Sequence, residues 1–321
     1  MEIRIYTRNT GRYLYEFNPV IIGIYVERTK IMDIKQFLAQ ATRQGASDIF
    51  VIAGRPVSYR MHGKIVALDD NKLMPADSYE LITSLYSLAE RNISEFESDG
   101  DDDFSFAVPG ISRFRVNTFR QRSSYAAVIR VISFDLPKPD ELHIPDAVMN
   151  LANENHGMVL VTGPAGSGKS TTLACLINKI NQEQEAHIIT LEDPLEYLHR
   201  HEKSIVSQRE ISTDTDSYLI ALRAALRQSP DVILLGEMRD YETINTAVTA
   251  AETGHLLFSS LHTIGAANTI DRIIDVFPEG QQQQVRVQLS NSLVAVFSQT
   301  LLPLLQPDGT KQGRVMAQEV M

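Results

Sequence analysis

The chain contains 321 residues, of which 43% are hydrophobic and 22% are charged, a composition typical of globular proteins rather than of disordered chains. This length corresponds to about two domains. The longest aliphatic stretch near the N-terminus, residues 20–26, is much shorter than the roughly 20 apolar residues that cross a bilayer. No Lys/Arg-rich start precedes a cleavable apolar segment. The sequence therefore predicts a cytosolic protein without stable membrane insertion.

The formal net charge is −10, and the chain has no basic tract that would follow a phosphate backbone. We therefore expect no binding to nucleic acid. A single cysteine, Cys175, excludes both an internal disulfide and a zinc site built from paired cysteines.

Residues 1–31 show no clear period, and we interpret them as an N-terminal extension of doubtful origin that precedes a natural start at Met32. An added pair of strands is an equally weighted alternative. A helical pattern then begins, with Asp33 as the expected N-cap. Its apolar residues recur at helical spacing: Ile34, Phe37, Leu38 and Ala41.

Residues 32–136 are expected to form a small α+β domain. Its predicted elements are strands over 48–53, 57–61 and 64–68, a helix over 76–91, and strands over 103–108, 112–119 and 126–133. An acidic run before the fourth strand is expected in a solvated loop: Glu97, Asp99, Asp101, Asp102 and Asp103. Two prolines then mark a linker over residues 137–145.

Residues 146–321 alternate predicted helices with short apolar strands at 158–162, 187–191, 232–235 and 256–261. Continuously apolar strands are buried on both faces, so this part of the chain predicts an α/β domain with a mostly parallel sheet. The chain ends in a strand-like stretch over 313–321, and we expect it to be cut short.

A predicted phosphate-binding loop follows the first of these strands. Residues 163–170 match G-x-x-x-x-G-K-[ST] between an apolar strand and an amphipathic helix. The glycines let backbone N–H groups converge on a phosphate, the lysine neutralises the β- and γ-oxygens, and the serine ligates Mg²⁺. An ordinary glycine-rich turn is the alternative. We expect ATP and Mg²⁺ at Gly163, Pro164, Ala165, Gly166, Ser167, Gly168, Lys169, Ser170 and Thr171.

The predicted strand at 232–235 is followed by Gly236 and Glu237, the pattern of a Walker B segment. Gly236 stands where an aspartate usually holds the Mg²⁺ shell, so Glu237 must serve there. We expect Ser170 and Glu237 to hold Mg²⁺, in part through water.

The predicted strand at 187–191 is followed by Glu192 and Asp193, with Glu196 three residues further on. Ligands of open α/β sheets bind at the carboxyl ends of the strands, so one of these acids can orient the attacking water. The alternative is that Asp193 and Pro194 simply end the strand and that the acids are solvated.

Histidines and arginines complete the candidate residues. His255 and His262 bracket the fourth apolar strand, and three roles remain open: sensing of the γ-phosphate, contact with a neighbouring subunit, and a structural role. Five arginines precede the linker, either on solvated strand faces or as cations offered to the transition state from another domain or subunit: Arg113, Arg115, Arg120, Arg122 and Arg130.

Together these motifs resemble the secretion-type hexameric ATPases, and within them the branch that retracts type IV pili. The resemblance spans residue 32 to the end of the chain. It implies a PAS-like N-terminal domain, a RecA-like ATPase domain, a homohexameric ring and ATP held between domains. It rests on residues 46–49, 112–117, 163–172, 190–197, 236–240, 250–255, 261–263 and 269–278, with glutamines at 281–284 behind them.

The resemblance also implies residue roles. Lys169 and Ser170 belong to the P-loop, Glu192 is the catalytic glutamate and Glu237 the Walker B acid. His255 and His262 form a histidine box, and Arg113, Arg115 and Arg130 contact ATP. The family's Gln-Asn-Arg reads Gln121-Arg122-Ser123 here, so the arginine that acts between subunits is either Arg122 or Arg120. Ala165 replaces a common threonine, a change that a backbone cradle tolerates.

Assembly-type members of the family usually carry a four-cysteine zinc insert, which Cys175 alone cannot supply. The implied function is an ATP-hydrolysing motor for type IV pilus retraction and twitching motility, docked on an inner-membrane pilus platform protein at the cytoplasmic side of the pilus base. The branch's C-terminal motif is missing, which keeps two alternatives open: a pilus-assembly or type II secretion motor, and a non-hydrolysing nucleotide-dependent scaffold. A motor stimulated by nucleic acid is less favoured because the chain is acidic.

Overall fold

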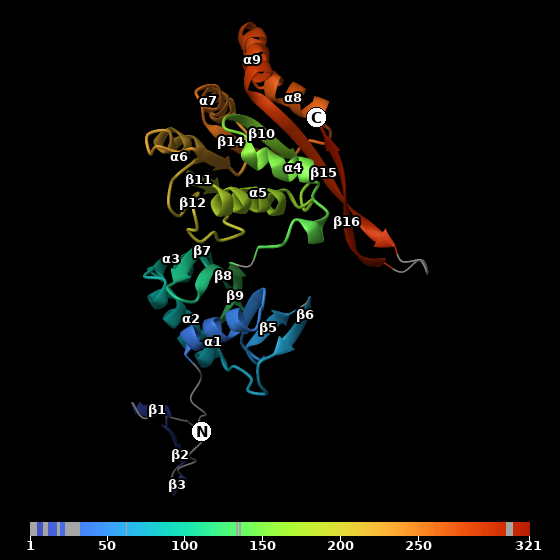
Figure 1. Ribbon diagram of the computed structural model, residues 1–321. Coiled ribbons are helices and arrows are strands. Elements are labelled where there is room, and N and C mark those ends of the chain that lie inside the picture. The colour runs from blue at the N-terminus through green and yellow to red at the C-terminus, as the bar shows by residue number, and fades with distance from the viewer. Residues whose placement is uncertain are drawn as a thin grey trace. The chain divides into compact units, whose positions relative to one another are not determined.

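The structure is a computed structural model (Figure 1) that describes residues 33–61, 63–132, 134, 136–305 and 311–321. It also describes the backbones of β1 (Ile5–Arg8), β2 (Arg12–Phe17) and β3 (Val20–Ile22), which form a three-stranded antiparallel sheet. The proposed start at Met32 and the rest of residues 1–31 lie outside the described residues. The chain divides into two compact units, Met1–Val131 and Ile132–Met321.

The first unit contains a six-stranded antiparallel sheet with the strand order β6-β5-β4-β9-β8-β7. Its helices are α1 (Ile34–Arg43), α2 (Pro75–Leu88) and α3 (Ser94–Asp99). Its strands are β4 (Asp48–Ile52), β5 (Ser58–Met61), β6 (Lys64–Ala67), β7 (Asp101–Val108), β8 (Ser112–Gln121) and β9 (Ser124–Ile132).

Helix α1 buries the four apolar residues that the sequence places on one face, which confirms that element. Asp33 occupies the N-cap position, but its side chain accepts no capping hydrogen bond, so the expected cap is not made. At α2 the start of the helix is held by the reciprocal contact, because Asp77 Oδ2 accepts a 2.7 Å hydrogen bond from the backbone N–H of the N-cap residue Met74.

The acidic run is not a loop, and that prediction is wrong. Glu97 and Asp99 lie in α3, and the next three acids lie in β7. Basic partners account for this, because Asp102 pairs with Arg91 at 2.9 Å and Asp103 pairs with Arg115 at 3.1 Å. These ion pairs let a run of like charges lie along a strand.

The second unit is a seven-stranded sheet with the strand order β12-β11-β13-β14-β10-β15-β16, parallel except for the final antiparallel pair. Its strands are β10 (Gly157–Thr162), β11 (His187–Glu192), β12 (Ile205–Glu210), β13 (Val232–Leu235), β14 (Leu256–Leu261), β15 (Leu293–Leu305) and β16 (Lys311–Val320). The predicted parallel α/β fold is confirmed.

Helices cover both faces of this sheet (Figure 1). Alternate residues of β10 face opposite layers: Met158 and Leu160 pack with residues of α6, α7 and α9, whereas Val159 and Val161 pack with residues of α4 and α5. The helices are α4 (Asp146–Met149), α5 (Lys169–Glu183), α6 (Tyr218–Ala225), α7 (Tyr241–Glu252), α8 (Ala266–Asp275) and α9 (Glu279–Ser292), with 3-10 turns η1 (Asp140–Leu142) and η2 (Asn150–Asn153).

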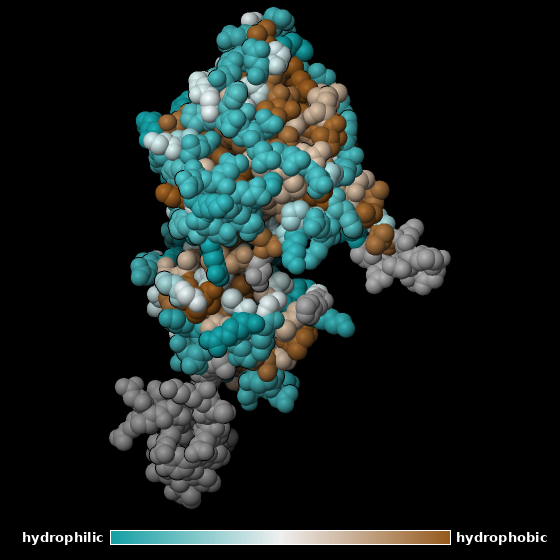
Figure 2. Space-filling model, viewed as in Figure 1, coloured by the Kyte–Doolittle hydropathy of each residue, from teal (hydrophilic) through white to brown (hydrophobic). Residues whose placement is uncertain are grey.

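The strand-like end of the chain forms β16, as predicted, and lies along β15 at the edge of the sheet. Apolar residues show at this edge in Figure 2, and the exposed ones on the two strands are Val294, Leu302, Leu304 and Val320. Within the described part of the chain, no helix combines the length and the apolar character needed to cross a bilayer.

Candidate functional site

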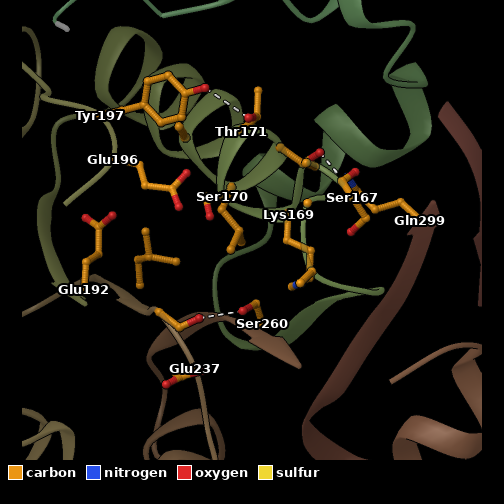
Figure 3. Close-up of a pocket in the computed structure, with 18 of the residues that line it drawn as sticks. Ser167, Lys169, Ser170, Thr171, Glu192, Glu196, Tyr197, Glu237, Ser260 and Gln299 are labelled. Carbon is orange, nitrogen blue, oxygen red and sulfur yellow. Dashed lines mark hydrogen bonds between the residues drawn. The ribbon is translucent and has the colours of Figure 1, made fainter. Parts of the chain in front are cut away.

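A cavity of about 720 Å³ lies in the second unit, where β10, β11, β13 and β14 end. Parallel strands place their carboxyl ends at one edge of a sheet, so the residues that follow each strand meet there. The loop after β10 lines the cavity together with residues that follow the other three strands, and Figure 3 shows these side chains around a common space.

The loop between β10 and α5 has a backbone that requires glycine. Gly163 has φ +144°, and a Cβ there would lie 2.0 Å from the carbonyl oxygen of Gln299. Gly166 and Gly168 have φ values of +74° and +92°, a region that favours glycine. The loop therefore passes close to β15 and delivers its last residues to the start of α5, whose N-terminus attracts phosphate.

The structure brings most of the predicted phosphate-binding residues to the cavity wall, namely Ala165, Gly166, Ser167, Gly168, Lys169, Ser170 and Thr171. Gly163 and Pro164 are not part of the cavity lining, but they contribute through their backbone. Their carbonyl oxygens accept hydrogen bonds from Lys169 Nζ at 2.9 Å and 3.1 Å. Thr171 Oγ1 is 3.0 Å from the Tyr197 hydroxyl, so this threonine also holds the loop that follows β11.

Lys169 is 7% exposed and is the cation at the start of α5. Burial lowers its pKa, while the nearby carboxylates of Glu196 and Glu237 raise it. Its ammonium group is thus surrounded by acceptors and lies 3.4 Å from His262 Nδ1. A side chain held in this way presents a positive charge to a bound phosphate.

Glu192 ends β11 and lines the cavity. Burial raises the pKa of Glu192 to about 7, and the carboxylates of Glu196 and Glu210 add to this rise. The hydrogen bond that Gln208 donates lowers the pKa of Glu192 and so acts in the opposite direction. A carboxylate whose pKa lies near neutrality is well matched to accept a proton from water.

Glu237 follows β13, and its two carboxylate oxygens face basic side chains. Arg239 Nε pairs with Oε1 at 2.7 Å, and His262 Nε2 lies 3.6 Å from Oε2. The structure also explains why Gly236 precedes it. A Cβ at position 236 would lie 2.8 Å from the Tyr218 hydroxyl and 3.1 Å from the Leu191 carbonyl oxygen, so a side chain there would require its neighbours to shift.

The two histidines lie at opposite ends of β14. His262 follows the strand and lines the cavity. His255 precedes the strand, and its Nδ1 is 3.0 Å from the carbonyl oxygen of Ala250. The structure therefore brings His262 to the phosphate-binding loop but does not bring His255 there. A contact of His255 with another subunit stays a prediction.

The predicted arginines lie in the first unit. Arg115 pairs with Asp103, Arg130 Nε lies 3.2 Å from Asp48 Oδ1, and Arg113 is part of β8. Arg122 and Ser123 form the turn between β8 and β9, with φ values of +47° and +60°. Their contribution to nucleotide binding stays a prediction.

The sequence analysis missed Gln299, which lines the cavity from β15. Its side chain donates to the carbonyl oxygen of Ser167 at 2.7 Å and accepts from Thr172 Oγ1 at 2.8 Å. The available signal was an amide in an otherwise mostly apolar strand. Gln208 of β12 was missed as well, because it only acts through contacts across the sheet.

Comparison with known proteins decides the family. The profile of the type II/IV secretion system protein family matches residues 27–320. The chain belongs to this family. Across 90% of its length it is 45% identical to the type IV pilus retraction ATPase PilT of Pseudomonas aeruginosa, and the match covers 82% of that protein. Across 90% of its length it is also 46% identical to a twitching motility protein of Neisseria gonorrhoeae, of which 75% is covered. The resemblance stated from the motifs is confirmed.

Solved structures of family members show the same fold. The crystal structure of the pilus retraction motor PilT with bound ADP matches with a TM-score of 0.79 and 49% identity, covering 90% of this chain and 83% of that one. The Legionella pneumophila ATPase DotB matches with a TM-score of 0.70 and 28% identity, covering 92% and 82%. The chain is therefore an ATPase of the secretion type with a nucleotide site.

Proposed function

We propose that the chain hydrolyses ATP in the cavity at the ends of β10, β11, β13 and β14, and that this reaction drives retraction of a type IV pilus. One observation carries the proposal: the cavity places Lys169 and Ser170 of the phosphate-binding loop opposite Glu192, whose pKa of about 7 suits a general base (Figure 3). A site for binding alone needs the loop but not this carboxylate.

Each group has one part in the reaction. A water molecule attacks the γ-phosphorus and transfers a proton to Glu192, while the bond from the γ-phosphorus to the bridging oxygen of ADP breaks. Lys169 and the N–H groups of the loop stabilise the charge that develops on the phosphate oxygens. Glu192 then releases its proton to solvent, leaving ADP and inorganic phosphate.

The residues present also fit Mg²⁺. Ser170 offers a hydroxyl oxygen and Glu237 a carboxylate, and both line the same cavity; these are the oxygen donors that Mg²⁺ prefers. When bound, the ion would neutralise part of the negative charge of the nucleotide's phosphates. The contacts of Glu237 with Arg239 and His262 hold its carboxylate at the rim of the cavity.

The proposal that ATP hydrolysis drives pilus retraction rests on similarity to known proteins. Relatives named for pilus retraction and twitching motility are 45% and 46% identical to this chain, compared with 33% for a type II secretion system protein E of Aeromonas hydrophila. This difference favours retraction over secretion. We further propose that the chain acts as a homohexamer at the cytoplasmic face of the inner membrane, docked on the pilus platform protein, and that an arginine of the first unit completes the nucleotide site between subunits.

Two measurements test the proposal. The first compares ATP turnover of the wild-type chain with that of Lys169→Ala and Glu192→Gln, with the mass of each measured by light scattering. The second expresses the chain in a bacterium that lacks its own retraction ATPase and scores twitching motility. We expect turnover by a hexamer, loss of turnover in both variants, and motility restored only by the wild type. Turnover without any restored motility would leave an ATPase with a different output and contradict retraction.

A further inference from the structure

Gln208 lies on the edge strand β12, beside the strand that carries Glu192. In the parallel register of β11 and β12, Gln208 is opposite Thr190, and Glu210 is opposite Glu192. Residues opposite each other in a ladder share a face of the sheet, and so do residues two apart along a strand. Polar side chains therefore gather on one face at this corner of the sheet: Thr190, Glu192, Gln208 and Glu210.

Side chains of β12 hold the segment that follows β11. The backbone N–H of Leu195 donates to Glu210 Oε2 at 3.2 Å, and that of His199 donates to Gln208 Oε1 at 2.7 Å. Gln208 Nε2 donates to the carbonyl oxygen of Tyr197 at 3.0 Å. The acidic segment after Glu192 is thus attached to β12 by side-chain contacts rather than by a strand ladder.

The amide of Gln208 also reaches Glu192, because its Nε2 lies 3.4 Å from Glu192 Oε1. The two backbone contacts fix which way the amide faces. A flipped amide would place its oxygen against the Tyr197 carbonyl and its NH₂ against the His199 N–H, and both hydrogen bonds would be lost. The group that meets Glu192 is therefore a donor.

From this geometry we propose that Gln208 is a positioning residue for hydrolysis, which orients the Glu192 carboxylate and keeps it ready to accept a proton from water. The inference rests on the proposed ATPase reaction and names a further residue that supports it. A neutral amide suits this task because it donates at every pH and adds no charge.

The groups around Glu192 explain why a donor matters. Glu196 of the following segment and Glu210 of β12 are both acidic, and burial together with nearby carboxylates, Glu192 among them, raises the pKa of the Tyr218 hydroxyl from α6. Burial and the two acids raise the pKa of Glu192, while the hydrogen bond from Gln208 lowers it. Loss of the Gln208 donor would raise the pKa of Glu192 further, so less of it would be ionised at neutral pH.

The test is the pH profile of kcat for Gln208→Glu and Gln208→Leu. The glutamate keeps the shape of the side chain and an acceptor for His199, but it removes the donors and adds a negative charge beside Glu192. We expect the acid limb of the profile of Gln208→Glu to shift to higher pH by about one unit. Turnover should be roughly tenfold lower than that of the wild type on this limb and should recover above about pH 8.5. Gln208→Leu should move the limb in the same direction by less. The Kd for ADP should stay within about twofold.

Gln283→Glu serves as the charge-matched control, since Gln283 is exposed on α9, and its profile should match the wild type. An unchanged acid limb, or turnover lowered equally at every pH, would overturn the proposal and leave Gln208 with a structural role alone. Loss of ADP binding in both variants would overturn it as well. If the wild type itself fails to turn over ATP, the proposed function fails, and that outcome is seen before any variant is compared.

Discussion

The side-chain amide of Gln299 donates a 2.7 Å hydrogen bond to the carbonyl oxygen of Ser167, across 132 residues of sequence. The other end of the same amide accepts from Thr172 Oγ1 at 2.8 Å. Gln299 is 3% exposed, and β15, which carries it, runs parallel to β10. One side chain thus ties the phosphate-binding loop to the first turn of α5.

Replacement of Gln299 by leucine should weaken nucleotide binding. The leucine fills a similar volume but leaves the Ser167 carbonyl and the Thr172 hydroxyl without this partner, at a cost of about 1–2 kcal/mol. We expect the Kd for ADP to rise roughly 5- to 30-fold and the free energy of unfolding to fall by a similar amount. Titration of ADP by calorimetry measures the first effect. Gln283→Leu, at an exposed position of α9, is the control, and an unchanged Kd in Gln299→Leu would contradict this role.

Glu192→Gln should make the protein more stable at alkaline pH. The folded-state pKa of Glu192 is raised from 4.5 to about 7, so folding binds a proton between these values and the free energy of unfolding falls as pH rises through them. A neutral glutamine removes this penalty. We expect the variant to exceed the wild type by about 1–3 kcal/mol at pH 8 and to equal it near pH 4. Urea unfolding at the two pH values checks this, and equal stability at pH 8 would show that the carboxyl titrates normally.

The sequence predicted the phosphate-binding loop, the parallel sheet and the acids Glu192 and Glu237, because each depends on local spacing. Predictions from the sequence were wrong or incomplete where contacts join residues that are far apart in the chain. The acidic run was placed in a loop because its ion pairs with Arg91 and Arg115 could not be seen. Gln208 and Gln299 were missed for the same reason, since strand order decides what each amide touches.

Gly236→Ala should disturb the site although it adds only one methyl group. Its Cβ would lie 2.8 Å from the Tyr218 hydroxyl and 3.1 Å from the Leu191 carbonyl oxygen, so the Tyr218 side chain or the end of β11 must shift. We expect a loss of about 1–3 kcal/mol in unfolding free energy and lower turnover. Gly280→Ala in α9, where a Cβ meets nothing within 4 Å, is the matched control.

A second substitution identifies the cause of this effect. Tyr218→Phe removes the hydroxyl that the new methyl group would meet, so the double variant should recover part of the stability that Gly236→Ala loses. Strictly additive effects of the two substitutions on unfolding would show that the hydroxyl is not the obstacle.

Substitution of Arg120 should affect stability, whereas substitution of Arg122 should affect ATP turnover. Arg120 Nη2 donates to the carbonyl oxygen of Glu97 at 2.6 Å, and its guanidinium lies 5.7 Å from the centre of the Tyr125 ring. Arg122 is exposed at the hairpin turn. We expect Arg120→Ala to lower the free energy of unfolding by about 1 kcal/mol. Arg122→Ala should lower ATP turnover of the assembled protein at least tenfold and leave the free energy of unfolding unchanged. The reverse pattern would assign the role between subunits to Arg120.

If Glu192 is the base that activates water, ATP hydrolysis by this chain should depend on its carboxylate. The most direct test is steady-state ATP turnover of the wild type and of Glu192→Gln from about pH 5.5 to 9, with ADP binding measured in parallel. We expect a wild-type acid limb near pH 7, set by the raised pKa of Glu192. The variant should bind ADP as well as the wild type but turn over ATP at least 100-fold more slowly. Turnover by Glu192→Gln at the wild-type rate would contradict this role of Glu192.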